Sequence, residues 1–206
     1  WTERAAGMPP RLVNVRDEAE QARFIAGRVL ESREAGAALK EQAVLFRASH
    51  HSGPLEIELT RRNIPFVKFG GLKFLEAAHV KDLLALLRFV ENPRDRVAGF
   101  RLLLLLPGIG PASAQRLLDH AAAASDPLAA LASAQPPQRA EADWGNFLAA
   151  VQTLASGRTA WPAEIEQARL WYATHLERRH DDADSRLADL VQLEQIAAGY
   201  PSRERF

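Results

Sequence analysis

The hydrophobic pattern of this chain changes at Gly70 and Gly71, and that change limits the folds it can adopt. Before the two glycines, short apolar runs typical of buried strands (residues 12–15, 43–46 and 64–69) alternate with segments of helical spacing (17–33 and 54–62). Strands separated by helices predict a parallel sheet. After the glycines, the apolar segments have helical spacing. We therefore expect an α/β region at residues 1–72 and an all-helical region at residues 73–206.

The predicted three-stranded sheet has two open edges, whereas a complete domain normally adds further strands. The chain also opens on Trp1 rather than methionine, so we interpret it as a piece of a longer protein that supplies the remaining strands. Ligands of a parallel sheet bind beyond the carboxyl ends of its strands. Residues 47–53, which follow the second strand, are therefore the place to look for chemistry in this region.

Local end signals predict where helices begin and end. Asp17 and Glu20 fit a capping box. A helix over residues 74–91 is ended by an Asn-Pro pair, and an Asp-Pro pair at 126–127 opens a short helix. Further helices are expected at residues 97–105, 112–123, 142–154, 163–178 and 185–198.

A glycine-rich turn at residues 106–111 connects two of these helices. Gly108 and Gly110 can adopt backbone angles that other residues avoid, and Pro111 suits the first position of the following helix. A helix start of this kind presents free amides to a phosphate, which predicts contact with a nucleic-acid backbone without sequence reading. The alternative is an αα-corner that packs Ile109 into a core.

Charge is balanced over the whole chain, with 26 Lys and Arg against 26 Asp and Glu, so any attraction of DNA must be local. The interval from Arg61 to Arg101 is basic and leads into the glycine turn. The alternative, which is the commoner case for any single one of these side chains, is a set of solvated helix faces. The chain has no cysteine, which fits a reducing compartment and excludes disulfides and thiolate metal sites.

Other conspicuous residues are explained better by structure than by chemistry. His50 and His51 lack a nearby carboxylate set for a metal, and the aspartates at 181, 182 and 184 lack the glycine and glutamate of a calcium loop. The aromatic residues Trp144, Trp161, Trp171 and Tyr172 have helical spacing and are expected in the core rather than stacked on bases. No segment has the features of a targeting signal or the length of a membrane span.

Several segments together resemble the UvrD/Rep family of superfamily 1 DNA helicases. They occur in the family's order and are residues 43–49, Glu56, 63–71, Phe74, 80–88, 92–95, 107–110 and 184–190. The resemblance implies the first part of the RecA-like domain 2A, followed by the helical 2B subdomain with a helix-hairpin-helix near residues 97–123. It also implies a parent protein that hydrolyses ATP with magnesium to move 3′ to 5′ along single-stranded DNA and to unwind duplexes.

The resemblance assigns DNA contacts to two regions. The turn at Gly108, Ile109 and Gly110 resembles the family's hairpin, which touches duplex DNA through backbone amides, and Ser113 is expected to add a hydroxyl contact. Arg47 matches the family's single-strand track, but Ser49, His51 and Gly53 replace the family's Asn, Gln and second Arg. Lys68 and Lys73 complete the expected phosphate contacts.

The chain lacks the Gly-x-x-x-x-Gly-Lys-Ser/Thr loop, so we expect no ATPase activity and no bound cofactor in this fragment, with ATP and magnesium bound by the parent. Expected partners are a single-strand/duplex junction of DNA, the parent's missing helicase domains and proteins that dock on 2B. We expect the protein in the cytoplasm, with no membrane as a partner. Two alternatives remain. One is a repair enzyme of the helix-hairpin-helix class, disfavoured because Ala112 stands where a reactive lysine would be. The other is a helical protein-interaction module.

Overall fold

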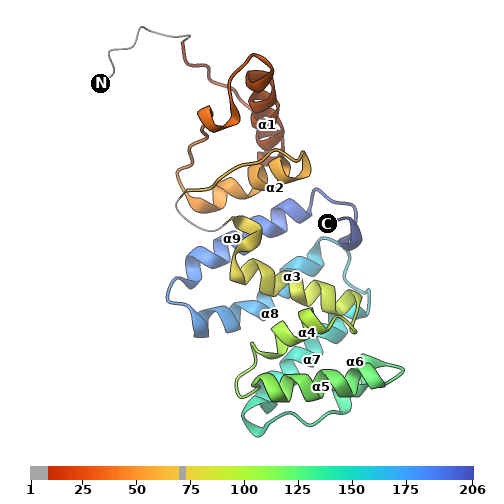
Figure 1. The fold of residues 1–206 in the computed structure, drawn as a ribbon. Helices are drawn as coiled ribbons and strands as arrows, with labels where there is room; N and C mark the ends of the chain where they lie inside the picture. Colours follow the sequence, from red (N-terminus) through yellow and green to blue (C-terminus); the bar gives the residue numbers. More distant parts are fainter. Residues whose placement is uncertain (1–8, 70–72) are drawn as a thin grey trace. The chain divides into compact units, whose positions relative to one another are not determined.

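The structure is a computed structural model that describes residues 9–69 and 73–206. All regular secondary structure within these residues is helical (Figure 1). The chain divides into two compact units: Trp1–Leu45 with Pro54–Phe66, and Phe46–Gly53 with Val67–Phe206. The expected all-helical character of the second region is therefore observed, and Gly70 and Gly71 lie outside the described residues.

The predicted parallel three-stranded sheet is wrong. No strand occurs in residues 9–69 or 73–206, and the three apolar runs at 12–15, 43–46 and 64–69 have no regular secondary structure. A strand exists only when a neighbour completes its hydrogen bonds, and no described segment does so here. Side chains expected to be buried are consequently exposed, with Leu12 at 91%, Leu45 at 93% and Phe69 at 91%.

The first unit is built around two helices, α1 (Glu18–Glu34) and α2 (Gly53–Arg61), with a short 3-10 turn η1 (Leu39–Glu41) between them in sequence. Its core contains Ala22 and Ala26 of α1, Leu55 and Leu59 of α2, and Ile64, which follows α2. The segment of helical spacing predicted at residues 17–33 therefore does place an apolar face against a core. That core is formed with another helix rather than with a sheet.

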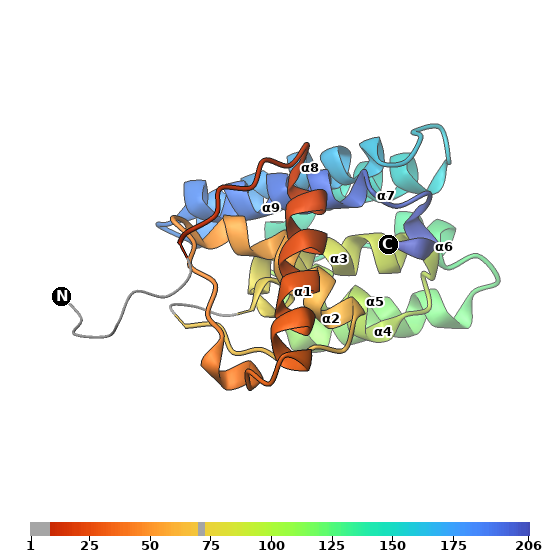
Figure 2. The ribbon, with the colours of Figure 1, turned by 90° about the horizontal axis from the view of Figure 1, so that it is seen from above.

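The second unit is a bundle organised around α3 (Ala78–Glu91), which packs against α4, α7, α8 and α9 (Figures 1 and 2). The other helices are α4 (Arg96–Leu103), α5 (Pro111–Ala123), α6 (Pro127–Ser133), α7 (Glu141–Ala155), α8 (Ala163–Arg179) and α9 (Ala183–Ala197). Short 3-10 turns are η2 (Ser49–Ser52), η3 (Phe74–Glu76), η4 (Gln138–Ala140) and η5 (Arg203–Arg205). Val80, Leu83, Leu86 and Phe89 of α3 are completely buried.

Most predicted helix ends agree closely with the structure because they depend on local chemistry. The helix expected over residues 74–91 begins only at Ala78, after the separate 3-10 turn η3. The Asp17 carboxylate accepts a hydrogen bond from the Glu20 amide at 2.7 Å, although the Glu20 carboxylate accepts from the Arg16 amide rather than closing the capping box. Asp126 caps α6 in the same manner, through the amides of the second and third helical residues. The Pro of the glycine turn occupies the first turn of α5, as expected.

A polar network holds α3, α4 and α8 together inside the second unit. Asp82 of α3 accepts a hydrogen bond from the Tyr172 hydroxyl of α8 at 2.6 Å and pairs with the Arg101 guanidinium of α4. Burial and the Asp82 carboxylate raise the pKa of Tyr172, so this phenol stays protonated and donates. The network fixes α8 relative to α4, the helix that leads into the glycine turn.

Candidate nucleic-acid interface

The hairpin, defined here as residues 104–110, joins α4 to α5 and has a buried inner side and an exposed outer side. Its inner leucines at 105 and 106 are 5% and 2% exposed, and the Ile109 side chain is 5% exposed. Pro107, Gly108 and Gly110 are exposed. The predicted arrangement of helix, turn and helix is observed, and burial of Ile109 also agrees with the αα-corner interpretation. The two interpretations are compatible because the apolar side chain anchors the turn that displays the glycines.

The two hairpin glycines differ in what their backbone requires. Gly108 has φ +83°, a left-handed conformation that favours glycine, and a Cβ there would lie 2.6 Å from the Arg139 Cβ. Gly110 has φ −93° and ψ 176°, which any residue adopts, and an added Cβ would meet nothing within 4 Å. Gly108 is therefore needed for the turn itself, whereas Gly110 leaves open space at the start of α5.

The hairpin amides are not equivalent donors. The Ile109 amide donates to the Leu106 carbonyl at 3.2 Å, so the turn itself occupies that donor. Within the described residues, the amides of Gly108 and Gly110 have no protein acceptor, and α5 has no side-chain cap. The amides of Ala112 and Ser113 in the first turn of α5 also have no acceptor within the described residues. Backbone contact with a phosphate would thus use the two glycine amides together with this first turn, while the Ile109 side chain holds the hairpin in place.

Of the other predicted contact residues, only Ser113 follows the hairpin closely in sequence. Ser113 lies in the first turn of α5, where its hydroxyl accepts a long hydrogen bond of 3.4 Å from Arg116. Arg47 is exposed just before η2, and Lys68 and Lys73 are half-buried on either side of the segment 70–72. None of these three is among the described residues that line the groove beside the hairpin.

Several arginines of the basic interval from Arg61 to Arg101 form hydrogen bonds or ion pairs with other parts of the protein. Arg94 donates to the carbonyl that follows the end of α5, at 2.9 Å. Arg96 pairs with Asp119 at 2.6 Å, and this hydrogen bond holds the pKa of Asp119 below its usual value. Arg101 belongs to the network inside the bundle. These contacts support the interpretation of the interval as structural charges on helix surfaces.

An open groove beside the hairpin brings in residues that the sequence pattern did not indicate. It is lined by residues 104–109 and by His175, Arg178 and Arg179 from the carboxyl-terminal end of α8. His175 is 3% exposed, and its burial lowers its pKa; the Asp143 carboxylate opposes this shift, and the two arginines add to it. Nothing in the sequence signals that α8 returns to the hairpin, because the two segments are distant along the chain.

The aromatic residues agree with the expectation that they serve the core. Trp144 and Tyr172 are 5% and 1% exposed, and Trp161 and Trp171 are half-buried. The Trp161 indole donates to the carbonyls of Ala197 and Tyr200, which ties the start of α8 to the end of α9. A role in stacking on bases therefore has no support from their placement.

The described residues contain neither a metal-binding cluster nor a membrane-spanning helix. No group of three or more histidine or acidic side chains in residues 9–69 and 73–206 is placed to hold a metal ion. Within the same residues, no helix combines the length and apolar character needed to cross a bilayer.

Residues 1–138 match the family model for the UvrD-like helicase C-terminal domain. The matched residues include the exposed glycine hairpin between α4 and α5. The chain therefore belongs to the UvrD-like helicases.

Individual relatives support this membership. The chain is 36% identical over 98 residues to DNA helicase II of Escherichia coli and to DNA helicase II of Haemophilus influenzae, matches that cover 48% of this chain and 14% of each relative. It is 29% identical over 122 residues to the ATP-dependent DNA helicase PcrA of Staphylococcus epidermidis, covering 59% of this chain and 17% of the relative. The matched segments thus span about one sixth of the relatives' length or less.

Proposed function

We propose that this chain is the DNA-binding and regulatory part of an ATP-dependent 3′–5′ DNA helicase that acts in replication or repair. The observation that carries the proposal is the exposed hairpin, whose Gly108 and Gly110 amides have no acceptor within the described part of the protein. Membership of the UvrD-like helicases supplies the context in which such a hairpin, interpreted as a helix-hairpin-helix, meets duplex DNA.

The chemistry of the hairpin favours binding without sequence preference. Backbone amides and the positive end of the α5 dipole attract a phosphate oxygen but carry no information about the bases. The backbone around Gly110 is open enough for such an approach, since no atom lies within 4 Å of the position a side chain would occupy. We therefore expect similar affinity for duplexes of unrelated sequence.

The catalytic activity belongs to the parent protein in this proposal. The chain contains no phosphate-binding loop, so ATP and magnesium would bind to other parts of the parent. The purified chain should accordingly show no DNA-stimulated ATP hydrolysis. Robust hydrolysis would contradict the proposed division of labour.

Fluorescence anisotropy with a duplex that carries a 3′ single-stranded tail tests the proposal. Gly110→Leu places a bulky side chain where the phosphate would approach, in a conformation that leucine tolerates, and should weaken binding equally for duplexes of different sequence. Gly27→Leu is a matched control, because Gly27 in α1 also has nothing within 4 Å of its added Cβ. Circular dichroism verifies that both variants fold.

The alternative is a helical protein-interaction module. It would be favoured if the chain failed to bind the tailed duplex at low salt. A loss of affinity confined to one DNA sequence would also contradict the backbone mechanism, since amides and a helix dipole cannot distinguish bases.

A further inference from the structure

Four arginines from three elements lie near the hairpin, and the sequence pattern alone does not distinguish them from other surface charges. Arg116 belongs to α5, Arg139 to η4, and Arg178 and Arg179 to the last turn of α8. We refer to these four residues as the arginine rim. Their convergence depends on packing, since the three elements are far apart in sequence.

Two members of the rim line the groove with the hairpin. Arg179 donates from Nη2 to the carbonyl of Leu104 at 2.9 Å, which holds its guanidinium against the end of α4. Arg178 pairs with Asp143 of α7, with 2.7 Å between Nη1 and Oδ1, and its side chain is 52% exposed. Each guanidinium has five N–H donors, so both contacts leave further donors for a ligand.

Of the other two members, Arg139 lies against the hairpin and Arg116 lies on α5. The Arg139 Cβ would be only 2.6 Å from a Cβ at Gly108, so the backbone of η4 lies directly against the left-handed glycine. Arg116 donates from Nη2 to the Ser113 hydroxyl at 3.4 Å. Arg116 and Arg139 are both exposed.

We propose that the arginine rim is a phosphate-binding surface that grips the backbone of duplex DNA beside the hairpin, and this inference rests on the proposed function. The hairpin amides are neutral and bind one phosphate at close range, whereas guanidinium groups attract phosphates through charge and can bind them in a bidentate manner. With arginines from α5, η4 and α8 around one turn, the surface can engage phosphates that neighbour the one at the hairpin.

The ion pair between Arg178 and Asp143 allows the charge of the rim to be changed by substituting either partner. Asp143 is 14% exposed at its side chain and holds the Arg178 guanidinium in place, but its negative charge also opposes an approaching phosphate. Removing that charge while keeping the shape, with Asp143→Asn, should therefore strengthen DNA binding. Removing the arginine should weaken it. Opposite effects from the two partners of one ion pair would not arise if the pair only stabilised the fold.

The test measures affinity for a blunt duplex by fluorescence anisotropy over a series of salt concentrations. Arg178→Ala combined with Arg139→Ala should weaken binding by about tenfold. It should also reduce the slope of log K against log salt by roughly one for each phosphate that the variant no longer binds. The single substitution Arg178→Lys, with Arg139 unchanged, should retain most of the slope of log K against log salt. Asp143→Asn should tighten binding by a few-fold.

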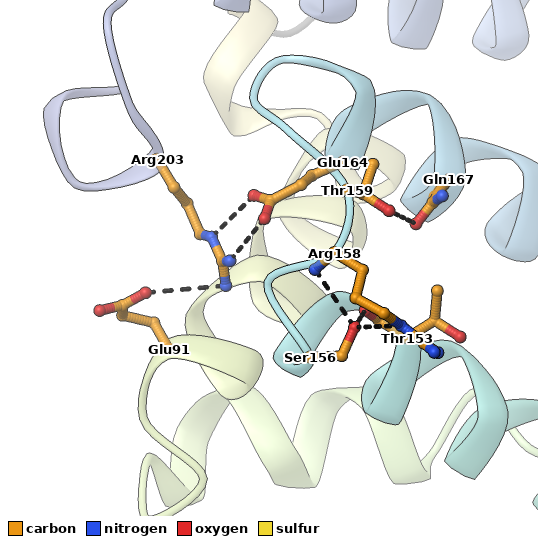
Figure 3. Close-up of polar contacts among 8 residues, drawn as sticks. All are labelled: Glu91, Thr153, Ser156, Arg158, Thr159, Glu164, Gln167 and Arg203. Atoms are coloured by element: carbon orange, nitrogen blue, oxygen red, sulfur yellow. Dashed lines mark hydrogen bonds and ion pairs between the residues drawn. The ribbon is translucent and has the colours of Figure 1, made fainter.

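Arg158→Ala is the matched control. Arg158 is exposed in the loop between α7 and α8, where its contact is the Ser156 hydroxyl at 3.3 Å (Figure 3). The 17 residues of α8 separate this loop from the rim by about 25 Å at the usual helical rise. Its removal lowers the net charge by the same amount as Arg178→Ala alone. Arg178→Ala should therefore weaken binding, whereas Arg158→Ala should leave affinity and slope unchanged.

Two results would overturn the inference in distinguishable ways. If the native chain binds DNA and Gly110→Leu weakens that binding, but the rim variants behave like Arg158→Ala, then the arginine rim does not bind phosphate and the proposed function stands. If the native chain does not bind DNA at low salt, both fall. Circular dichroism of each variant verifies that weaker binding is not caused by unfolding.

Discussion

Replacing Gly108 with alanine should destabilise the second unit, and the structure allows the cost to be worked out. A left-handed backbone costs an L-residue about 1–2 kcal/mol, and Gly108 has φ +83°. The new methyl group would lie 2.6 Å from the Arg139 Cβ, and relieving such crowding costs about 1–3 kcal/mol. The lower entropy of the unfolded alanine chain returns about 0.4–1 kcal/mol. The net decrease in the free energy of unfolding is therefore about 3 kcal/mol, within a range of about 1–5 kcal/mol.

Gly110→Ala is the matched control at the other glycine of the hairpin. Its φ of −93° suits alanine, and the added methyl meets no atom within 4 Å. The poorer capping ability of alanine costs about 0.5–1 kcal/mol, which the unfolded-state entropy approximately offsets. The variant should therefore unfold within about 0.5 kcal/mol of the native chain.

Thermal and urea unfolding followed by circular dichroism measure both effects. For a chain of this size the Gly108→Ala cost corresponds to a decrease of about 5–15 °C in the midpoint. Equal stability of the two variants would refute the reasoning. It would mean either that the turn relaxes without cost or that Gly108 does not adopt the left-handed conformation in solution.

Three further predictions concern the bundle that supports the hairpin. Gly99→Ala in α4 would place a methyl 2.6 Å from a leucine of α5 and should lower the free energy of unfolding by about 1–3 kcal/mol. Gly27→Ala, which is in open space on α1, should instead raise the free energy of unfolding by about 0.5–1 kcal/mol. Urea unfolding measures both effects. Tyr172→Phe removes the hydrogen bond to Asp82 and should cost about 1–3 kcal/mol in the same assay; no loss would show that the network does not stabilise the bundle. Burial lowers the pKa of His175, so the unfolded chain binds more protons than the folded one as the pH decreases through about 6.5. The free energy of unfolding should therefore decrease between pH 7 and pH 5, and by less in His175→Gln. Identical pH dependence in the two proteins would contradict this.

The helices and their ends were predictable because their signals are local. Expected helices at residues 112–123 and 163–178 correspond to α5 at Pro111–Ala123 and α8 at Ala163–Arg179. Asp17 caps the first helix, as the capping signal at this position indicated. In each case the deciding contacts lie within four residues along the chain, so periodicity and capping chemistry were sufficient.

The sheet and part of the candidate site were not predictable in this way. An apolar run such as residues 43–46 becomes a strand only if another strand pairs with it, and none of the described residues does. Arg96 and Arg178 both form an ion pair with an aspartate, and the pattern could not show that only Arg178 of these two also lines the groove. Both have the same charge and helical context in the sequence.

The amino-acid sequence by itself determined the helical segments, the position of the glycine turn and membership of a helicase family, because each depends on residues that are neighbours along the chain. Only the tertiary structure decided which charges surround that turn. The packing of α3 against α4 and α8 brings Arg178 and Arg179 to the hairpin. Contacts between distant segments form when apolar faces are buried together, and no spacing within one segment encodes their geometry.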